Sequence, residues 1–100
     1  MKKFLTMKLI NKDSRGVFYS IVNDKFQNLS FIFSKKGSIR SNHYHLKDSH
    51  YIYVLDGKME YIYKKKDSKA KVRKKILKKG DIVFTPPNEV HCTKFIKDTN

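Results

Sequence analysis

The spacing of the apolar residues is the strongest constraint on how this chain folds. No stretch of a dozen residues places apolar side chains at i, i+3, i+4 and i+7, the pattern of an amphipathic helix. β-branched and aromatic residues instead form short runs separated by Gly, Asn, Asp and Pro. Strands are predicted at Phe4–Ile10, Val17–Val22, Phe26–Ser34, Ser38–Leu46, His50–Leu55, Lys58–Lys64, Lys71–Leu77, Asp81–Thr85 and Val90–Ile96. Many short strands at close spacing predict an all-β sandwich or small barrel.

Length and composition exclude several other classes of protein. One hundred residues allow one compact domain, which we expect to span residues 1–100. Cys92 is the only cysteine, so neither an intrachain disulfide nor a Cys-rich zinc module can form. No apolar run approaches the roughly 18–20 residues needed to cross a bilayer. We therefore expect a soluble cytoplasmic protein without a membrane partner.

The net charge of +14 first suggests a nucleic-acid-binding protein. However, 20 of the 23 basic residues are Lys, whereas base and phosphate recognition relies on the planar fork of Arg. The charge is also concentrated, because residues 64–79 carry ten Lys or Arg against one Asp. Lysines along an exposed edge strand prevent strand-to-strand aggregation. We interpret this run as a solvated hairpin and edge strand and expect no specific nucleic-acid partner.

The clearest local signal is Asp56-Gly57, which lies between two strand-like runs and predicts a two-residue type I′ hairpin. Such a turn would place Leu55 opposite Lys58, so that alternate residues of both strands share one face. The residues expected on the interior face are His50, Ile52, Val54, Met59, Tyr61 and Tyr63. Tyr51, Tyr53 and Glu60 would point outward, where the tyrosines could pack against a second sheet or a dimer partner.

Four histidines have a spacing that suits a metal site. His43 and His45 are two residues apart, so on a strand both imidazoles project to the same face. His50 begins the next predicted strand with interior parity, and His91 follows Pro86-Pro87-Asn88-Glu89. Each histidine alone would more often be a surface or hydrogen-bonded residue, so the interpretation depends on all four together. Four converging imidazoles suit Zn, Fe, Ni, Cu or Mn.

The same spacing resembles the two motifs of the cupin superfamily. Residues 37–57 match G-x5-H-x-H-x(3,4)-E-x6-G, with His50 in the place of the Glu. Residues 80–95 match G-x5-P-x-G-x2-H-x3-N, except that Asn88 replaces a Gly and Phe95 the final Asn. The resemblance implies a double-stranded β-helix, the cupin jelly-roll barrel, that is often a homodimer. It also implies one divalent transition metal (Zn, Fe, Ni or Mn) bound by His43, His45, His50 and His91.

A narrower resemblance is to the dTDP-4-dehydrorhamnose 3,5-epimerases and the 3,4-ketoisomerases of dTDP-sugars. Asp13-Ser14-Arg15-Gly16-Val17-Phe18 looks like their D-x-R-G-x-F, and Arg40-Ser41-Asn42-His43-Tyr44 looks like R-G-x-H-Y without its Gly. The resemblance implies that Arg40 and Arg15 bind the nucleotide diphosphate and that His43 is the catalytic base. Those epimerases work without metal, and a ligated His43 could not also be a free base. From charge and turn chemistry alone, Arg15 and Arg40 are equally well surface cations.

Tyr63 and Tyr61 are candidate proton carriers because the predicted register places them near His50. Tyr63 could equally be part of the core. We expect an enzyme that epimerises or isomerises a small-molecule substrate, a nucleotide-linked keto sugar. Two alternatives remain open: an Fe(II)-dependent dioxygenase, and a non-catalytic module that binds a metal or a sugar.

Overall fold

The computed structural model describes residues 2–42, 48–66, 69 and 71–100, which fold into strands joined by turns and loops. This part of the chain contains no helix long and apolar enough to span a membrane. The strands are β1 (Phe4–Thr6), β2 (Lys8–Asp13), β3 (Gly16–Ser20), β4 (Ile39–Asn42), β5 (His50–Tyr53), β6 (Lys58–Lys65), β7 (Arg73–Lys78), β8 (Asp81–Thr85) and β9 (Glu89–Phe95). The all-β prediction is confirmed.

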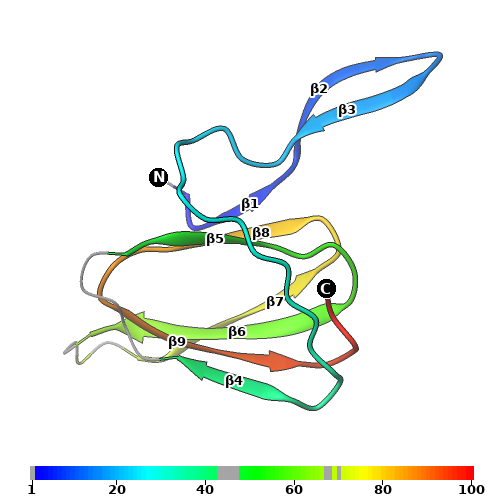
Figure 1. Ribbon diagram of the computed structural model, residues 1–100. Coiled ribbons are helices and arrows are strands. Elements are labelled where there is room, and N and C mark those ends of the chain that lie inside the picture. The colour runs from blue at the N-terminus through cyan, green and yellow to red at the C-terminus, as the bar shows by residue number, and fades with distance from the viewer. Residues whose placement is uncertain (1, 43–47, 67–68, 70) are drawn as a thin grey trace.

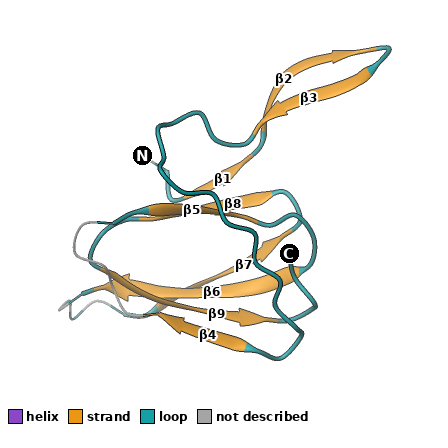
Figure 2. Ribbon diagram, viewed as in Figure 1, coloured by secondary structure: helices purple, strands orange, loops and turns teal. Residues whose placement is uncertain are grey.

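Two antiparallel sheets face each other and form the walls of the barrel (Figures 1 and 2). One sheet has the strand order β1-β8-β5 and the other β4-β9-β6-β7. Alternation along each strand turns apolar side chains toward the space between the sheets. The buried core between them consists of Val54, Met59, Tyr61, Leu77, Val83 and Phe95, with Phe4, Ile52 and Tyr63 packed against it.

The predicted hairpin at Asp56-Gly57 is wrong. β5 pairs with β8, whereas β6 pairs with β7 and β9, so the chain crosses from one sheet to the other between β5 and β6. The C-terminal residue occupies the turn instead: the Asn100 carbonyl accepts from Leu55 N at 2.9 Å, and Asn100 N donates to Asp56 O at 2.9 Å. Gly57 has a φ of 108°, and a Cβ there would lie 2.5 Å from the Asp98 carbonyl. The glycine therefore admits the C-terminal segment rather than a type I′ turn.

The predicted faces of β5 and β6 are nevertheless confirmed. Val54, Met59 and Tyr61 are buried in the core. Alternation depends only on each strand being extended, so the interior set is the same whether the strands lie side by side or face each other. On the outer face, the ring of Tyr51 lies 4.9 Å from that of Phe84, and the hydroxyl of Tyr53 is 3.1 Å from the sulfur of Met7.

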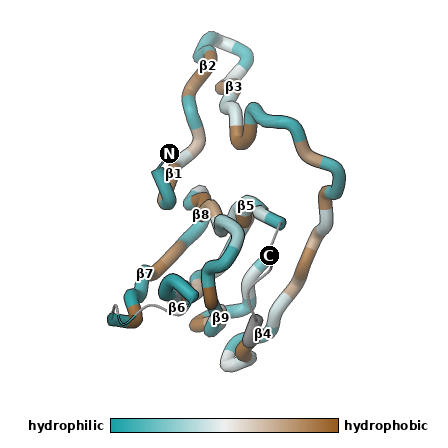
Figure 3. Tube along the Cα trace, turned by 90° about the vertical axis from the view of Figure 1, so that its left-hand side faces the viewer, coloured by the Kyte–Doolittle hydropathy of each residue, from teal (hydrophilic) through white to brown (hydrophobic). Residues whose placement is uncertain are grey.

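The largest error of the strand prediction concerns the N-terminal third. The expected strand Phe4–Ile10 is divided between β1, which joins the barrel, and β2, which forms a separate hairpin with β3. The expected strand Phe26–Ser34 is absent: only Ser34 forms a bridge, with Thr99. This segment runs along the outside of the barrel, as Figure 3 shows. Of the expected strand Ser38–Leu46, residues 39–42 form β4 and 43–46 lie outside the described residues.

The basic run is located as expected. Its described residues include the end of β6 and all of β7, and β7 is an edge strand of its sheet. Among the residues of β7, only Leu77 is buried, and the lysines around it are exposed. This exposure fits the interpretation as a solvated edge.

Candidate functional site

His50 and His91 meet in the barrel interior from opposite sheets. His50 begins β5, and His91 lies on β9 with only 3% of its surface exposed. Their ring centroids are 5.6 Å apart, at an interplanar angle of 68°. The Nδ1 atom of His91 lies 3.2 Å from the carbonyl oxygen of Glu89. The structure thus brings together two of the four predicted ligands, and His43 and His45 lie outside the described residues.

A buried tyrosine lies directly against this pair. Tyr61 of β6 is fully buried, and its ring stacks on that of His91 with a centroid distance of 5.7 Å and an angle of 16°. Its hydroxyl is 2.6 Å from the Thr85 hydroxyl and donates a hydrogen bond to the Glu89 carboxylate. Tyr61 therefore connects the histidine pair to a polar network in the core.

Lys3 completes this network from the other end of the chain. Its ammonium donates to the second carboxylate oxygen of Glu89 at 2.5 Å and to the Phe84 carbonyl at 2.9 Å. It also lies over the rings of Tyr61 and Tyr63, 5.0 and 4.7 Å from their centroids, at cation–π distances. A buried carboxylate is stable when it is both paired and hydrogen-bonded, and Glu89 has both kinds of partner.

The environment of this network determines which groups can carry protons. Burial, reinforced by the hydrogen bond to Glu89, raises the pKa of Tyr61 far above its ordinary value. Burial also lowers the pKa of Lys3, although the attraction of Glu89 opposes that shift. At neutral pH the phenol of Tyr61 therefore holds its proton and acts as a donor, not as a base.

Sequence reasoning found only part of this network. Tyr61 was predicted from the alternation along β6, but Lys3, Thr85 and Glu89 were missed. Glu89 carried a usable signal, because it lies two residues before His91 and so shares its strand face. Lys3 carried none, since it is 86 residues from its carboxylate partner and reaches it only through the pairing of β1 with β8.

Tyr63 occupies a less enclosed position. It pairs with His91 in the β6–β9 register and is only partly buried. Its ring packs edge-to-face on Phe4 at 5.7 Å and lies 5.4 Å from that of Tyr61. Tyr63 thus contributes to the core and also lies on the wall that carries His91.

A cavity of about 280 Å³ opens beside the buried network. Its lining consists of Lys3, Phe84, Pro86 and Glu89, and it is open to solvent on one side. The ion pair of Lys3 and Glu89 thus separates the fully buried Tyr61 from this cavity. A small polar ligand there would meet one cation and one carboxylate.

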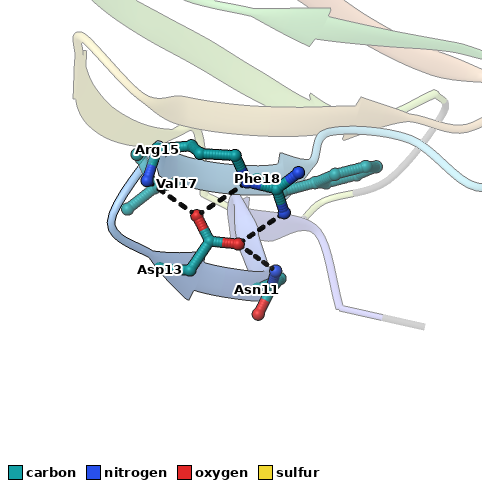
Figure 4. A pocket seen from close by; sticks show the side chains of 6 residues that line it. Asn11, Asp13, Arg15, Val17 and Phe18 are labelled. Atoms are coloured by element: carbon teal, nitrogen blue, oxygen red, sulfur yellow. Dashed lines mark hydrogen bonds and ion pairs between the residues drawn. The ribbon is translucent and has the colours of Figure 1, made fainter.

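The two predicted substrate-binding arginines lie far from each other. Arg40 of β4 pairs with Thr93 of β9 and donates from Nε to the Ser34 hydroxyl at 2.9 Å. Arg15 lies at the turn of the β2–β3 hairpin, which projects from the barrel (Figure 1). There its Nη2 is 2.6 Å from the Asp13 carboxylate, beside a hollow of about 310 Å³ (Figure 4). This ion pair lowers the pKa of Asp13. Within one chain, Arg15 does not join the histidine pair.

A comparison with protein families matches residues 30–100 to the cupin domain. The chain belongs to the cupin family. A search of curated proteins finds no match. Among solved structures, this cupin is similar to the dTDP-4-dehydrorhamnose 3,5-epimerase from Sulfolobus tokodaii, with a TM-score of 0.67 and 21% sequence identity. The similarity covers 95% of this chain and 72% of that chain, and at this identity it confirms the jelly-roll fold.

One departure from the cupin motifs is explained by the backbone. Asn88, which stands where the second motif has Gly, adopts a φ of 64°. Asn tolerates this left-handed conformation better than other non-glycine residues. The turn before β9 therefore keeps its shape, and His91 keeps its inward orientation.

Cupin domains commonly bind a metal, and the described residues of this cupin fit one in part. Two imidazoles that share a tetrahedral ion place their ring centroids about 5 Å apart, given metal–nitrogen bonds near 2.0–2.1 Å. The separation of His50 and His91 is close to that value. Within the described ranges, no group of three or more His, Cys, Asp or Glu residues could hold a metal. A complete set would therefore need His43 and His45.

Proposed function

We propose that this cupin binds one divalent transition metal and catalyses proton transfer on a keto sugar, as an epimerase or isomerase. The ligands would be His43, His45, His50 and His91. The observation that carries the proposal is the meeting of His50 and His91, from opposite walls of the barrel, against a buried and protonated Tyr61. The structural similarity to an enzyme named for a dTDP-sugar epimerisation supports the substrate class.

The polar side chains next to the histidine pair are connected to one another by hydrogen bonds. Thr85, Tyr61, Glu89 and Lys3 form a hydrogen-bonded series that runs from the barrel interior to the cavity at Lys3. A proton lost at one end of such a series can be replaced from the other. Tyr61 and Tyr63 would be the donors in this arrangement. A bound metal would act there as a Lewis acid toward a carbonyl oxygen.

His43 has two alternative roles in this proposal. It can be a ligand or the base that removes a proton beside the keto group, but one imidazole cannot do both at once. If His43 is the base, the other three histidines remain as metal ligands. The exchange of the substrate proton then requires that His43 is not bound to the metal.

A nucleotide diphosphate would suit the electrostatics of the protein. The net charge of +14 attracts anions, and Arg40 is an exposed cation whose register partner Thr93 has the same parity as His91. Arg40 would bind the diphosphate from β4. Arg15 would contribute only if the hairpin that carries it reached the same ligand.

Deuterium exchange measured together with metal content tests the proposal. Protein purified without chelator is analysed for metal and then incubated in D₂O with a nucleotide-linked 4-keto sugar. We expect bound metal, and deuterium at the carbons that flank the keto group. An H91A variant should lose both. A metal-free protein that still exchanges would exclude the metal but retain the epimerase, whereas absence of exchange with the metal bound would refute the enzymatic proposal.

The same experiment distinguishes the alternative functions. Bound iron with substrate-dependent oxygen uptake would indicate a dioxygenase. Bound metal without exchange or oxygen uptake would indicate a binding module.

A further inference from the structure

The four-stranded sheet β4-β9-β6-β7 has a side that faces away from the core. The sheet is the lower wall of the barrel in Figure 1, and its inner side looks toward β5 and β8. On β9, Thr93 and Phe95 are buried, so by alternation Cys92 and Lys94 point outward. The registers of β4 and β6 against β9, and of β7 against β6, assign the outward residues of the other strands. We call this set the outer face; it consists of Ile39, Lys58, Glu60, Ile62, Lys64, Lys74, Ile76, Lys78, Val90, Cys92, Lys94 and Ile96.

Positive charge dominates the outer face. The set contains five lysines and one acidic residue, Glu60, and so carries a net charge of +4. Lys74, Lys78 and Lys94 are exposed to solvent. Within the described part of the chain, none of the five lysines forms an ion pair. Their charge is therefore available to an anionic partner.

Isoleucines lie among these lysines. Ile39 is 60% exposed, Ile76 41% and Ile96 36%. The ladder places Lys94 between Ile39 and Glu60, and Ile96 N donates to the Lys58 carbonyl at 2.9 Å. The solvated side of an antiparallel sheet normally carries polar residues at its outward positions. Exposed isoleucines at these positions indicate a surface with an apolar as well as a cationic contact to make.

The outer side of the opposite sheet differs. There the hydroxyls of Tyr51 and Tyr53 contact Asp24 at 3.4 Å and Met7 at 3.1 Å, both from the N-terminal third of the chain. The ring of Tyr51 also packs against that of Phe84. The chain thus places side chains of its own on the outside of β5, whereas the isoleucines of the outer face are left exposed.

The arrangement of the lysines suits a planar anionic surface. Four strands about 4.8 Å apart, with a rise of about 3.4 Å per residue, spread them over roughly 15 by 20 Å on one side of one sheet. Against a plane, all five can lie within a Debye length of about 8 Å at the same time. Lys is a compact point charge that requires no planar, bidentate acceptor. Duplex DNA would offer phosphates to the lysines but no apolar layer to the isoleucines.

We propose that the outer face binds the surface of an anionic phospholipid bilayer. The lysines contact the charged headgroups, and Ile39, Ile76 and Ile96 enter the boundary between headgroups and acyl chains. Binding of this kind requires no membrane-spanning segment, because buried apolar area and attraction to anionic lipids together supply the affinity. The proposal does not depend on the proposed catalysis, since His91 has the opposite strand parity and is buried in the barrel.

Co-sedimentation with vesicles at physiological salt tests the proposal. The vesicles contain phosphatidylcholine alone or phosphatidylcholine with phosphatidylserine. The face variant K74Q/K78Q/K94Q is compared with the control variant K8Q/K12Q/K25Q, in which all three lysines are also exposed. Each variant removes three charges from the same +14, so net charge alone cannot distinguish them.

We expect the unmodified protein to bind only the vesicles that contain phosphatidylserine. A lysine near an anionic bilayer strengthens binding roughly fivefold, so the face variant should bind about 100-fold more weakly. The control variant should lose less than about threefold, because its lysines lie beyond the screening length. Absence of binding to phosphatidylserine vesicles would overturn the proposal, as would equal losses in the two variants when their circular dichroism is unchanged.

A second pair of variants tests the apolar contact. I39S removes an isoleucine from the outer face, and I10S removes one from β2 that is 52% exposed. I39S should weaken vesicle binding roughly threefold or more, and I10S should not. Duplex DNA binding that the face variant loses and I39S keeps, without vesicle binding, would overturn the proposal and assign the lysines to nucleic acid. Deuterium exchange by the face variant should equal that of the unmodified protein, so a failure of the catalytic proposal would leave the vesicle result unaffected.

Discussion

Removing one oxygen atom, in Y61F, tests whether the buried network exists as described. The substitution keeps the ring that stacks on His91 but deletes the hydroxyl that contacts Thr85 and Glu89. Glu89 is 8% exposed and Thr85 3%, so solvent can hardly replace the lost partner. A hydrogen bond to a charged group contributes about 1.5–3 kcal/mol, and the unpaired Thr85 hydroxyl adds a further cost. We expect the free energy of unfolding to fall by roughly 2–4 kcal/mol.

The assay is urea denaturation, with all variants compared at the same protein concentration because association makes apparent stability depend on concentration. Y53F is the matched control, because the Tyr53 hydroxyl contacts only a sulfur atom, a weak acceptor, in the described contacts. It should cost less than about 0.5 kcal/mol. If Y61F is no more destabilising than Y53F, Tyr61 is not bonded to a buried carboxylate and the proton series through Glu89 does not exist.

Three further predictions concern the turn before β6 and the histidine pair. G57A should destabilise the fold by about 2 kcal/mol more than G37A. Both glycines have a positive φ, but only at Gly57 would a Cβ collide with the C-terminal backbone. Equal urea midpoints for the two variants would contradict this. H91A should lose bound metal, measured by elemental analysis, whereas C92S on the opposite strand face should retain it. Y63F should reduce deuterium exchange without loss of metal, and undiminished exchange would remove Tyr63 from the mechanism.

The side of each strand that faces the core could be predicted from the sequence, whereas the pairing of distant strands could not. Alternation along a strand depends on the backbone alone, so the interior faces of β5 and β6 were predicted correctly from residues such as Val54 and Met59. The partner of each strand depends on the rest of the chain. Asp56-Gly57 has the composition of a hairpin turn, yet the C-terminal Asn100 uses the turn's hydrogen bonds and β6 pairs with β9.

The N-terminal third shows the same limit. Residues 26–33 have strand propensity, but propensity supplies no neighbouring strand, and within the described residues no backbone–backbone hydrogen bond joins them to one.

The absence of helical periodicity indicated an all-β sandwich or small barrel, and the resemblance of residues 37–57 and 80–95 to the two cupin motifs indicated which one. Both signals are local, because they depend on the order of neighbouring residues. The family comparison confirms that fold. The contact between Lys3 and Glu89 could be found only in three dimensions. The physical reason is that the pairing of distant strands brings these two charged groups together. No local sequence pattern specifies which strands will pair.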